Sequence, residues 1–405
     1  MSILITKDNS LGVNVPRLER LDKYLQSLVD DKKHSYVQFH VMRRGELIFE
    51  GNYGVANPDG TPMTSGAIHP MQSVTKPFTA TCCAILQEDG LLDFWEPAAN
   101  YFPELAEGDK AEIAVWHLLC HTSGFDEDAA DKFVDTYLKD ELGIVIPEDT
   151  PKEEQIDLYM QVRAKMGLPE IERGWGAVND TYRRLTLKAP LTAKTGTSFS
   201  YFNMGYQMLS EIVEKISGIA YIDFVQKHIF EPLGMTDSFF IMTPEKRERY
   251  VLRDPAFRSG EYMNSEDLMN STHAAGGLKS TLPDLLRFGQ MFLQNGTFDG
   301  VRIISPASVR LMTTDHNVGI PDSFWRSRYL GANWGFGWDV KNGKKDDLGM
   351  LRGERSYNHC GYGGSRLHVD PDAELVVALY IVEQREDAAC DDQSNAMNVL
   401  YSAFD

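Results

Sequence analysis

A serine and a lysine stand three residues apart in the stretch Met71-Gln72-Ser73-Val74-Thr75-Lys76-Pro77-Phe78. The pattern indicates the start of a helix, where this spacing places both side chains on one face of the first turn. The helix amino terminus adds unpaired N–H groups and the positive end of a dipole. A serine hydroxyl becomes a nucleophile when a base removes its proton, and an amine in a positive field can be that base. Ser73 and Lys76 are therefore candidates for nucleophilic catalysis, although the same pair also fits an ordinary surface helix.

A tyrosine and an asparagine form a second candidate group at the start of another predicted helix. The segment Phe199-Ser200-Tyr201-Phe202-Asn203-Met204-Gly205-Tyr206 opens a run whose apolar residues recur at helical spacing until Gly218. A phenol can share one proton with an amine if either group has its pKa lowered from the solution value of about 10. Taken alone, Tyr201 also fits a residue at the edge of the core, and Asn203 fits a helix cap.

The third group is His359-Cys360-Gly361-Tyr362-Gly363-Gly364, just before a predicted terminal hairpin. In this order the three groups resemble the penicillin-recognising serine hydrolases, in the branch of class C β-lactamases, D-alanyl-D-alanine carboxypeptidases and family VIII-type carboxylesterases. Three further segments are similar to segments of that family, namely Leu118-Leu119-Cys120-His121-Thr122-Ser123-Gly124, Ile229-Phe230-Glu231-Pro232-Leu233-Gly234-Met235 and Ala275-Gly276-Gly277-Leu278-Lys279-Ser280-Thr281. The resemblance covers nearly the whole chain.

The resemblance implies acyl transfer through a covalent ester on Ser73. Tyr201 would act with Lys76 as general base for the attack and as general acid toward the leaving group. Asn203 can accept a hydrogen bond from the ammonium and donate one to a substrate carbonyl.

The resemblance also assigns the oxyanion donors to the backbone N–H groups of Ser73 and Tyr362. Such a donor is usually worth about 3 kcal/mol of barrier height. A small residue at Gly361 is expected to let the substrate lie against the strand.

The chain departs from the family pattern at His359, where penicillin-cleaving members generally carry a lysine. A neutral imidazole donates a hydrogen bond but attracts a substrate carboxylate poorly at pH 7. This substitution resembles the esterase and peptidase branches more than dedicated β-lactamases. Arg366, two residues beyond Gly364, either supplies a replacement cation or points to solvent.

We therefore expect a serine hydrolase that acts on a small ester or amide substrate, most similar to a carboxylesterase. Alternatives are a β-lactamase or D-amino-acid peptidase or amidase, an acyltransferase, and a non-catalytic scaffold or binding protein of the same fold. The presence of Ser73, Lys76 and Tyr201 argues against the last of these.

Two other patterns are interpreted as structural. Lys194-Thr195-Gly196 spells the third motif of the family but lies directly before the tyrosine segment, so we expect a loop. His117 and His121 stand four residues apart, a spacing that metals use on helices, but no further ligand completes a set. We expect no metal and no cofactor. Cys360 is expected to point away from the cleft, because strand neighbours alternate.

Composition excludes some partners. The formal net charge of −19 argues against binding nucleic acid or an anionic membrane surface. Five cysteines, an odd number without framework spacing, indicate reduced thiols. The first residues have no secretory signal pattern, so we expect a cytoplasmic protein, provided that no leader has been removed. The sequence gives no indication of oligomeric state.

The predicted elements indicate how these groups are positioned. We expect a helix over 16–30, a hairpin built from 36–42 and 47–50, and a terminal hairpin whose turn is Asp370-Pro371-Asp372. A mainly helical middle separates them.

The expected fold class is α/β (α+β) and β-lactamase/transpeptidase-like, with an antiparallel sheet built from both chain ends and flanked by helices. We expect a single unit of 1–405, with a sheet lobe from 1–70 and 300–405. A helical lobe of 71–299 carries an insertion at about 126–190.

Overall fold

The computed structural model describes residues 2–147, 149–253, 260–321, 331–345, 348–381 and 391–404. Contacts divide the chain into two compact units. The first comprises Met1–Asp93, Tyr206–Gly319 and Ser327–Asp405, and the second comprises Phe94–Gly205 and Ile320–Arg326. The lobe boundaries that we expected from the sequence, at 70 and 299, remain a prediction.

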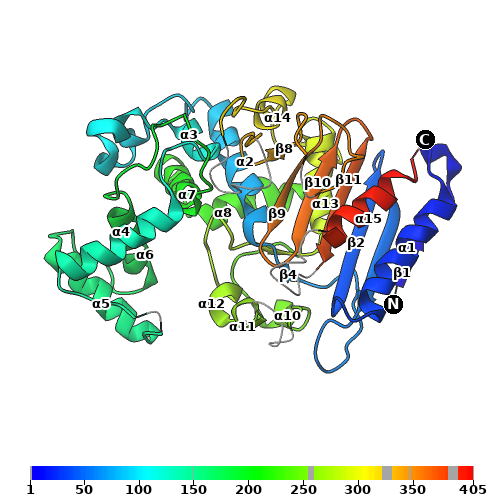
Figure 1. Cartoon of the computed structure of the whole chain (residues 1–405), viewed down its shortest axis with the longest axis horizontal. Coiled ribbons are helices and arrows are strands. Elements are labelled where there is room, and N and C mark those ends of the chain that lie inside the picture. Colours follow the sequence, from blue (N-terminus) through cyan, green and yellow to red (C-terminus); the bar gives the residue numbers. More distant parts are fainter. Residues whose placement is uncertain are drawn as a thin grey trace. The chain divides into compact units, whose positions relative to one another are not determined.

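The first unit is built on a seven-stranded antiparallel sheet of order β1-β3-β2-β11-β10-β9-β8. Its strands are β1 (Ser2–Ile5), β2 (Tyr36–Arg43), β3 (Glu46–Gly54), β8 (Asp339–Val340), β9 (Tyr357–Gly361), β10 (Ser365–Asp370) and β11 (Leu375–Ile381). Strands from both chain ends therefore share one sheet, as the sequence predicted (Figure 1).

Both predicted hairpins are confirmed. In the first, Arg43 pairs with Glu46, and the two turn residues Arg44 and Gly45 have φ values of 53° and 84°. Two residues with positive φ match the twist of the flanking strands, which is why short hairpins favour this turn. The second hairpin pairs Asp370 with Leu375. Val382, which follows β11 directly, lies outside the described residues.

Helices cover both faces of the sheet (Figure 1). The predicted first helix, α1 (Val15–Asp30), packs with α15 (Asp391–Tyr401) on one face. Helix α13 (Leu282–Leu293) packs on the other face, where a Cβ on Gly289 would overlap the side chain of Val376. Alternate residues of each strand thus enter different cores. The face toward α1 includes Leu18, Leu21, Leu25 and Leu28 of that helix with Val37, Phe39, Val41, Val377 and Leu379 of the sheet.

The remaining elements of the first unit are short apart from α2. They are α2 (Thr75–Glu88), α8 (Tyr221–Val225), α9 (Glu231–Leu233), α10 (Pro244–Arg247), α11 (Gly260–Met263), α12 (Glu266–Met269) and α14 (Pro306–Met312), with the strand pairs β4 (His69–Pro70)/β5 (Lys279–Ser280) and β6 (Thr297–Phe298)/β7 (Val301–Arg302). Helix α7 (Asn203–Ser217) begins in the second unit, and the boundary between the units falls within it.

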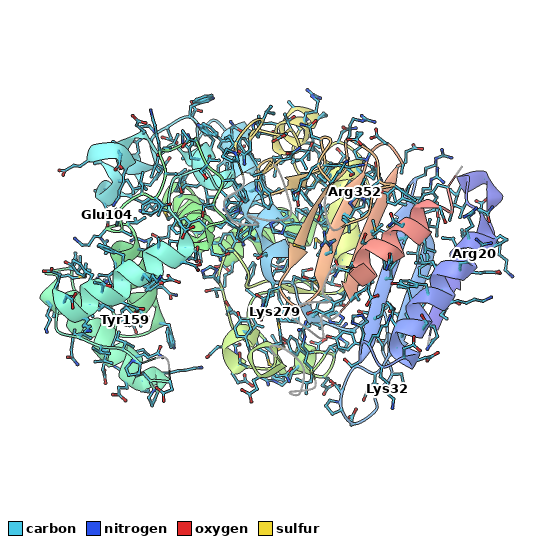
Figure 2. The ribbon with its side chains drawn as sticks, viewed as in Figure 1. Arg20, Lys32, Glu104, Tyr159, Lys279 and Arg352 are labelled. Carbon is cyan, nitrogen blue, oxygen red and sulfur yellow. The ribbon has the colours of Figure 1, made fainter. Side chains whose placement is uncertain are left out.

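The second unit is helical in its described part. It contains α3 (Val115–Leu119), α4 (Glu127–Asp140), α5 (Lys152–Lys165) and α6 (Trp175–Thr186). Helices α4 to α6 enclose a small core, in which the partly buried Tyr159 packs (Figure 2). Asp180 forms ion pairs with Arg163 at 2.5 Å and with Arg184 at 3.0 Å. Arg184 also forms an ion pair with Glu104, at 2.5 Å. The segment that we expected to be an insertion therefore has its own core, and its ion-pair network extends to Glu104 outside it.

No helix in the described ranges combines the length and the apolar character that crossing a bilayer requires.

Buried histidines form part of the sheet core. His69 is fully buried, and its Nε2 lies 2.5 Å from Oε1 of Gln38. Burial lowers the pKa of His69 to about 3. Burial also lowers the pKa of His40, and that of His368 falls well below its usual range. These imidazoles are neutral in the folded protein at pH 7.

We predict that lowering the pH destabilises the fold. An unfolded histidine takes up a proton near pH ~6.5, whereas folded His69 does so only near pH 3. Between these values the unfolded state binds more protons, so the free energy of unfolding falls as the pH falls, by about 1.4 kcal/mol per pH unit for each such histidine. Thermal unfolding followed from neutral pH down to about pH 4 measures this slope. A flat melting temperature over that range would contradict it.

Candidate active site

The serine and lysine occupy the helix start that the sequence predicted. A 3₁₀ turn, η2 (Gln72–Val74), carries Ser73 and leads directly into α2. Lys76 Nζ donates a hydrogen bond to Ser73 Oγ at 3.1 Å. Lys76 is fully buried, whereas Ser73 is half-buried. A buried amine thus contacts a hydroxyl that still has exposed surface.

A backbone carbonyl holds the amine in place. Lys76 Nζ donates a second hydrogen bond, of 2.9 Å, to the carbonyl of Ala275, and it lies 5.6 Å from the ring centroid of Tyr206. Hydrogen bonds on both sides of Ala275 hold this segment to α2. Thr79 donates to the carbonyl of Ala274 at 2.7 Å, and the N–H of Leu278 donates to Thr75 at 3.1 Å.

The same segment contains a buried lysine that the sequence analysis did not assign. This residue is Lys279 (Figure 2). Its Nζ donates to three backbone carbonyls, those of Leu268, Ser271 and Gly277, at 3.0, 3.1 and 2.7 Å. Burial lowers the pKa of Lys279 to about 7. These bonds close the loop that presents the carbonyl of Ala275 to Lys76.

The residue before the serine has an unusual backbone conformation. Gln72 has a φ of 49°, in the left-handed region that residues other than glycine rarely adopt. Such a conformation costs on the order of 1–3 kcal/mol and persists only where the surroundings impose it. Here the N–H of Met71 donates to the carbonyl of Leu278 at 2.8 Å, and Ser365 Oγ donates to the carbonyl of Met71 at 2.8 Å. The serine is thus presented on a strained turn that is held from two sides.

The glycine of the third motif has a structural role in addition to the one that we expected, which stays a prediction. A Cβ on Gly361 would lie closer than 3.0 Å to both the carbonyl oxygen of Met71 and Oγ of Ser365. Strand β9 therefore needs glycine here because it packs directly on the serine segment, and not only to accommodate a substrate. Tyr362 follows in an exposed turn that closes with a 3.1 Å bond from the N–H of Gly364 to the carbonyl of Gly361.

His359 is buried near the lysine and is neutral. Its Nδ1 lies 2.8 Å from the carbonyl of Cys360, and its ring meets the ring of Trp334 edge-on at 5.5 Å. Burial, reinforced by the charge of Lys76, lowers the pKa of His359 to about 3. His359 and Gly361 share one face of β9, and the half-buried Cys360 is on the other, as predicted.

Arg366 does not provide the replacement cation that we considered. It pairs with Cys360 across the β9–β10 ladder, on the opposite face from His359. There its buried guanidinium donates to Oε1 of Gln393 in α15 and to Oδ1 of Asn358, both at 2.8 Å. The positive charge of Arg366 therefore lies beneath helix α15, where these hydrogen bonds hold it.

Tyr201 and Asn203 belong to the second unit, where the segment around them is well fixed. The ring of Tyr201 stacks on His121 with centroids 4.3 Å apart, and Nδ1 of His121 accepts the N–H of Phe202 at 3.0 Å. The N–H of Asn203 donates to Glu127 at 2.7 Å. The reaction roles of Tyr201 and Asn203 stay a prediction.

Both of the patterns that we interpreted as structural form hydrogen bonds with the backbone. His117 Nδ1 accepts the N–H of Ala114 at 3.0 Å. In the Lys194-Thr195-Gly196 loop, the N–H of Gly196 donates to the carbonyl of Thr122 at 2.8 Å. Thr195 Oγ1 donates to the carbonyl of Ser123 at 3.1 Å. This loop therefore supports the segment that carries His121, as a structural loop should.

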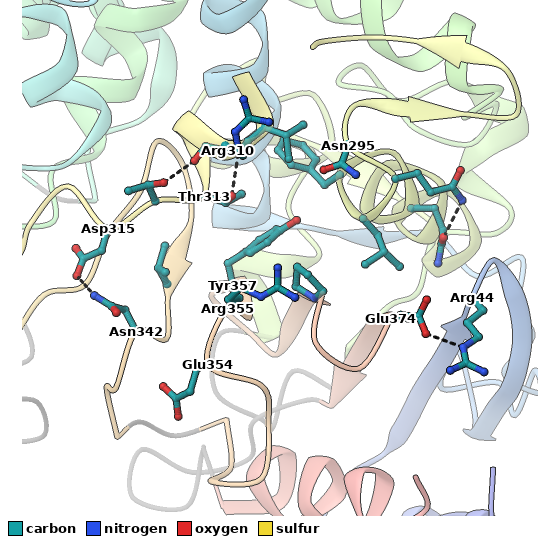
Figure 3. Close-up of a pocket in the computed structure, with 18 of the residues that line it drawn as sticks. Arg44, Asn295, Arg310, Thr313, Asp315, Asn342, Glu354, Arg355, Tyr357 and Glu374 are labelled. Atoms are coloured by element: carbon teal, nitrogen blue, oxygen red, sulfur yellow. Dashed lines mark hydrogen bonds and ion pairs between the residues drawn. The ribbon is translucent and has the colours of Figure 1, made fainter. Parts of the chain in front are cut away.

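A cavity of about 1010 Å³ lies elsewhere in the first unit (Figure 3). It is lined by Tyr357 at the start of β9, whereas Gly361 at the end of that strand lies by the serine segment. None of the seven predicted site residues lines it. Arg44 pairs with Glu374 at 2.6 Å, and Asp315 accepts from Asn342 at 3.0 Å, so these polar groups bind one another.

Comparison with known proteins agrees with the resemblance seen in the motifs. A sequence model described as Beta-lactamase matches residues 21–399. An uncharacterized protein of Mycobacterium tuberculosis is 27% identical over 384 residues, which cover 87% of this chain and 86% of that protein. A solved family VIII carboxylesterase has a TM-score of 0.74 at 17% identity, with full coverage of both chains. A class C β-lactamase structure has a TM-score of 0.67 at 17% identity and covers 97% of each chain.

We predict that Gly361→Ala impairs both stability and activity. The added methyl group would push β9 away from Met71, at a cost of about 1–3 kcal/mol in the free energy of unfolding. A displacement of the serine segment near 1 Å lowers kcat/KM by about 10². Ester turnover and thermal unfolding measure the two effects.

The matched control is Gly176→Ala, since a Cβ there meets nothing within 4 Å. Wild-type turnover in Gly361→Ala would contradict the steric argument.

Proposed function

This chain belongs to the β-lactamase family, and on that premise we propose that it is a serine hydrolase that cleaves small esters or amides through an acyl-enzyme on Ser73. Members of this family include esterases, β-lactamases and D-alanyl-D-alanine carboxypeptidases. The observation that carries the proposal is the 3.1 Å contact between Lys76 Nζ and Ser73 Oγ, at a strained helix start. Among these activities we favour a carboxylesterase.

In the first step, Ser73 Oγ attacks the substrate carbonyl and transfers its proton toward the Lys76 and Tyr201 pair. The amine is suited to this role because the Ala275 carbonyl fixes its position. Tyr201 then passes the proton to the leaving group, and the same groups activate a water molecule that hydrolyses the ester. Asn203 is proposed to hydrogen-bond the lysine and the substrate.

The negative charge that develops on the carbonyl oxygen requires preformed donors. We assign these to the N–H groups of Ser73 and Tyr362. Ser73 lies at the beginning of a helical segment, where backbone N–H groups have no acceptor within the helix and the dipole is positive. Tyr362 follows Gly361, which packs on the serine segment. Both donors are therefore carried by parts of the backbone that are held together.

We favour ester substrates over β-lactams and peptides because of His359. Its pKa, near 3, keeps it neutral, so it attracts the carboxylate of a β-lactam or a peptide terminus weakly. An uncharged ester or amide does not need such an anchor. Comparing rates on p-nitrophenyl acetate, a chromogenic cephalosporin and D-alanyl amides tests this choice, and much faster cephalosporin turnover would reverse it.

We predict that Ser73→Ala and Lys76→Ala each abolish acylation while the melting temperature stays near that of the wild type. Intact-mass detection of a fluorophosphonate adduct measures acylation directly. Absence of the adduct in the wild-type protein would identify a non-catalytic member of the fold.

Tyr201→Phe removes only a hydroxyl group, and we expect the rate to fall by about 10²–10⁴, the usual effect of losing an acid–base group. The ring that stacks on His121 is kept, so the fold should be unaffected. Full activity in this variant would show that the phenol takes no part in proton transfer.

We predict that His359→Ala changes substrate preference more than it changes turnover of a small activated ester. The imidazole is proposed to contact the part of the substrate beyond the reacting carbonyl. The ratio of kcat/KM values for two esters that differ in that part measures the effect. Equal losses on both esters would contradict it.

A further inference from the structure

Arg253 is a buried cation beside the turn that carries Tyr362. The side chain is 2% exposed. Its Nη2 donates to the carbonyl oxygen of Gly363 and to Oη of Tyr380, the latter at 2.8 Å. The guanidinium carbon lies 5.7 Å from the ring centroid of Tyr380. The cation is thus directed at the residue that follows the proposed oxyanion donor.

No carboxylate in the described ranges forms an ion pair with Arg253. A guanidinium remains charged at any physiological pH, and burying a charge without an opposite charge costs several kcal/mol. The acceptors around it are the carbonyl of Gly363 and the phenols of Tyr380 and Tyr36, which compensate only in part. Within the described residues, the guanidinium is therefore held by neutral acceptors, one of which is the backbone of the turn.

The backbone of Arg253 is itself fixed. Its N–H donates to Oδ1 of Asn264 at 2.8 Å, and its carbonyl accepts from Nδ2 of the same side chain at 2.7 Å. Tyr380, on β11, stacks on His69 with centroids 4.2 Å apart, and His69 begins strand β4, just before the serine segment. Arg253 therefore connects the turn to the part of the fold that carries Ser73.

The turn needs such a connection because it consists largely of glycine. Gly361, Gly363 and Gly364 surround Tyr362, and glycine loses more conformational freedom on ordering than any other residue. Gly363 has a φ of 90°, and a Cβ there would lie closer than 3.0 Å to the guanidinium. Without a fixed partner, the peptide N–H of Tyr362 would have no defined direction.

We propose that Arg253 is a positioning residue for the oxyanion site, which holds the Gly361–Gly364 turn so that the N–H of Tyr362 meets the developing oxyanion. This inference rests on the proposed function. Arg253 does not touch the substrate, since it acts through the carbonyl of Gly363. An oxyanion donor contributes only when it is oriented in advance, because hydrogen-bond strength depends steeply on distance and angle.

The test compares Arg253→Met with wild-type protein in ester hydrolysis and in binding of an arylboronic acid. The boronic acid bonds to Ser73 Oγ as a tetrahedral anion and thus needs the oxyanion donors. We expect kcat to fall by about 10² with KM changed by less than about threefold. The boronate inhibition constant should rise in parallel with the loss of kcat/KM.

Arg352→Met is the matched control, because Arg352 is another buried arginine, 3% exposed, that precedes β9 (Figure 2). It reports the general effect of removing a buried guanidinium from this unit. Equal effects of Arg253→Met and Arg352→Met on kcat and on boronate binding, with wild-type acylation intact, would overturn this inference alone. Absence of Ser73-dependent acylation in the wild type would overturn the proposed function, and this inference with it.

Arg253→Lys serves if the methionine variant does not fold. It keeps the charge but loses the planar fork that bonds two acceptors at once. We expect an intermediate loss of kcat, about tenfold, with the same parallel loss of boronate affinity. Wild-type kcat and boronate affinity in this variant would overturn the proposal.

Discussion

The contact between a buried amine and a half-buried hydroxyl is the interaction on which the proposed chemistry depends. Lys76 cannot leave its position without breaking its bond to the carbonyl of Ala275 as well as that to Ser73. Because the lysine is fully buried, a lost bond would not be replaced by water, so the site is ordered before substrate binds. The left-handed backbone at Gln72 is maintained by the same surroundings, which is how strain is kept in a functional segment.

The sheet contributes by fixing the serine segment from the side. Ser365 bonds the carbonyl of Met71, and Gly361 allows β9 to approach it without a side chain between them. Because β9 and β10 are internal strands of a sheet with helices on both faces, the sheet and its cores help to set their positions. A small displacement of these strands would therefore move the serine segment as well.

Local patterns predicted the elements well, because helix starts and tight turns are encoded by nearby residues. The helix that begins directly after the turn carrying Ser73 and the hairpin around Arg44 and Gly45 follow from local sequence pattern and turn chemistry. The partner of Lys76 could not be predicted in this way, since a carbonyl belongs to every residue and only the fold selects Ala275. The same holds for Arg253, which has no motif around it and meets Gly363 across 110 residues of chain.

The distribution of cations supports the proposal that this site takes an uncharged substrate. Arg366 is bonded beneath α15, Arg253 is bonded to the carbonyl of Gly363, and His359 is neutral. Each of these three groups is therefore either hydrogen-bonded within the fold or without charge. Lys76 remains, but its bonds to Ser73 and Ala275 direct it at the reacting hydroxyl rather than at the far end of a substrate. The charges of these groups therefore support the proposed catalysis at a carbonyl over anchoring of an anion.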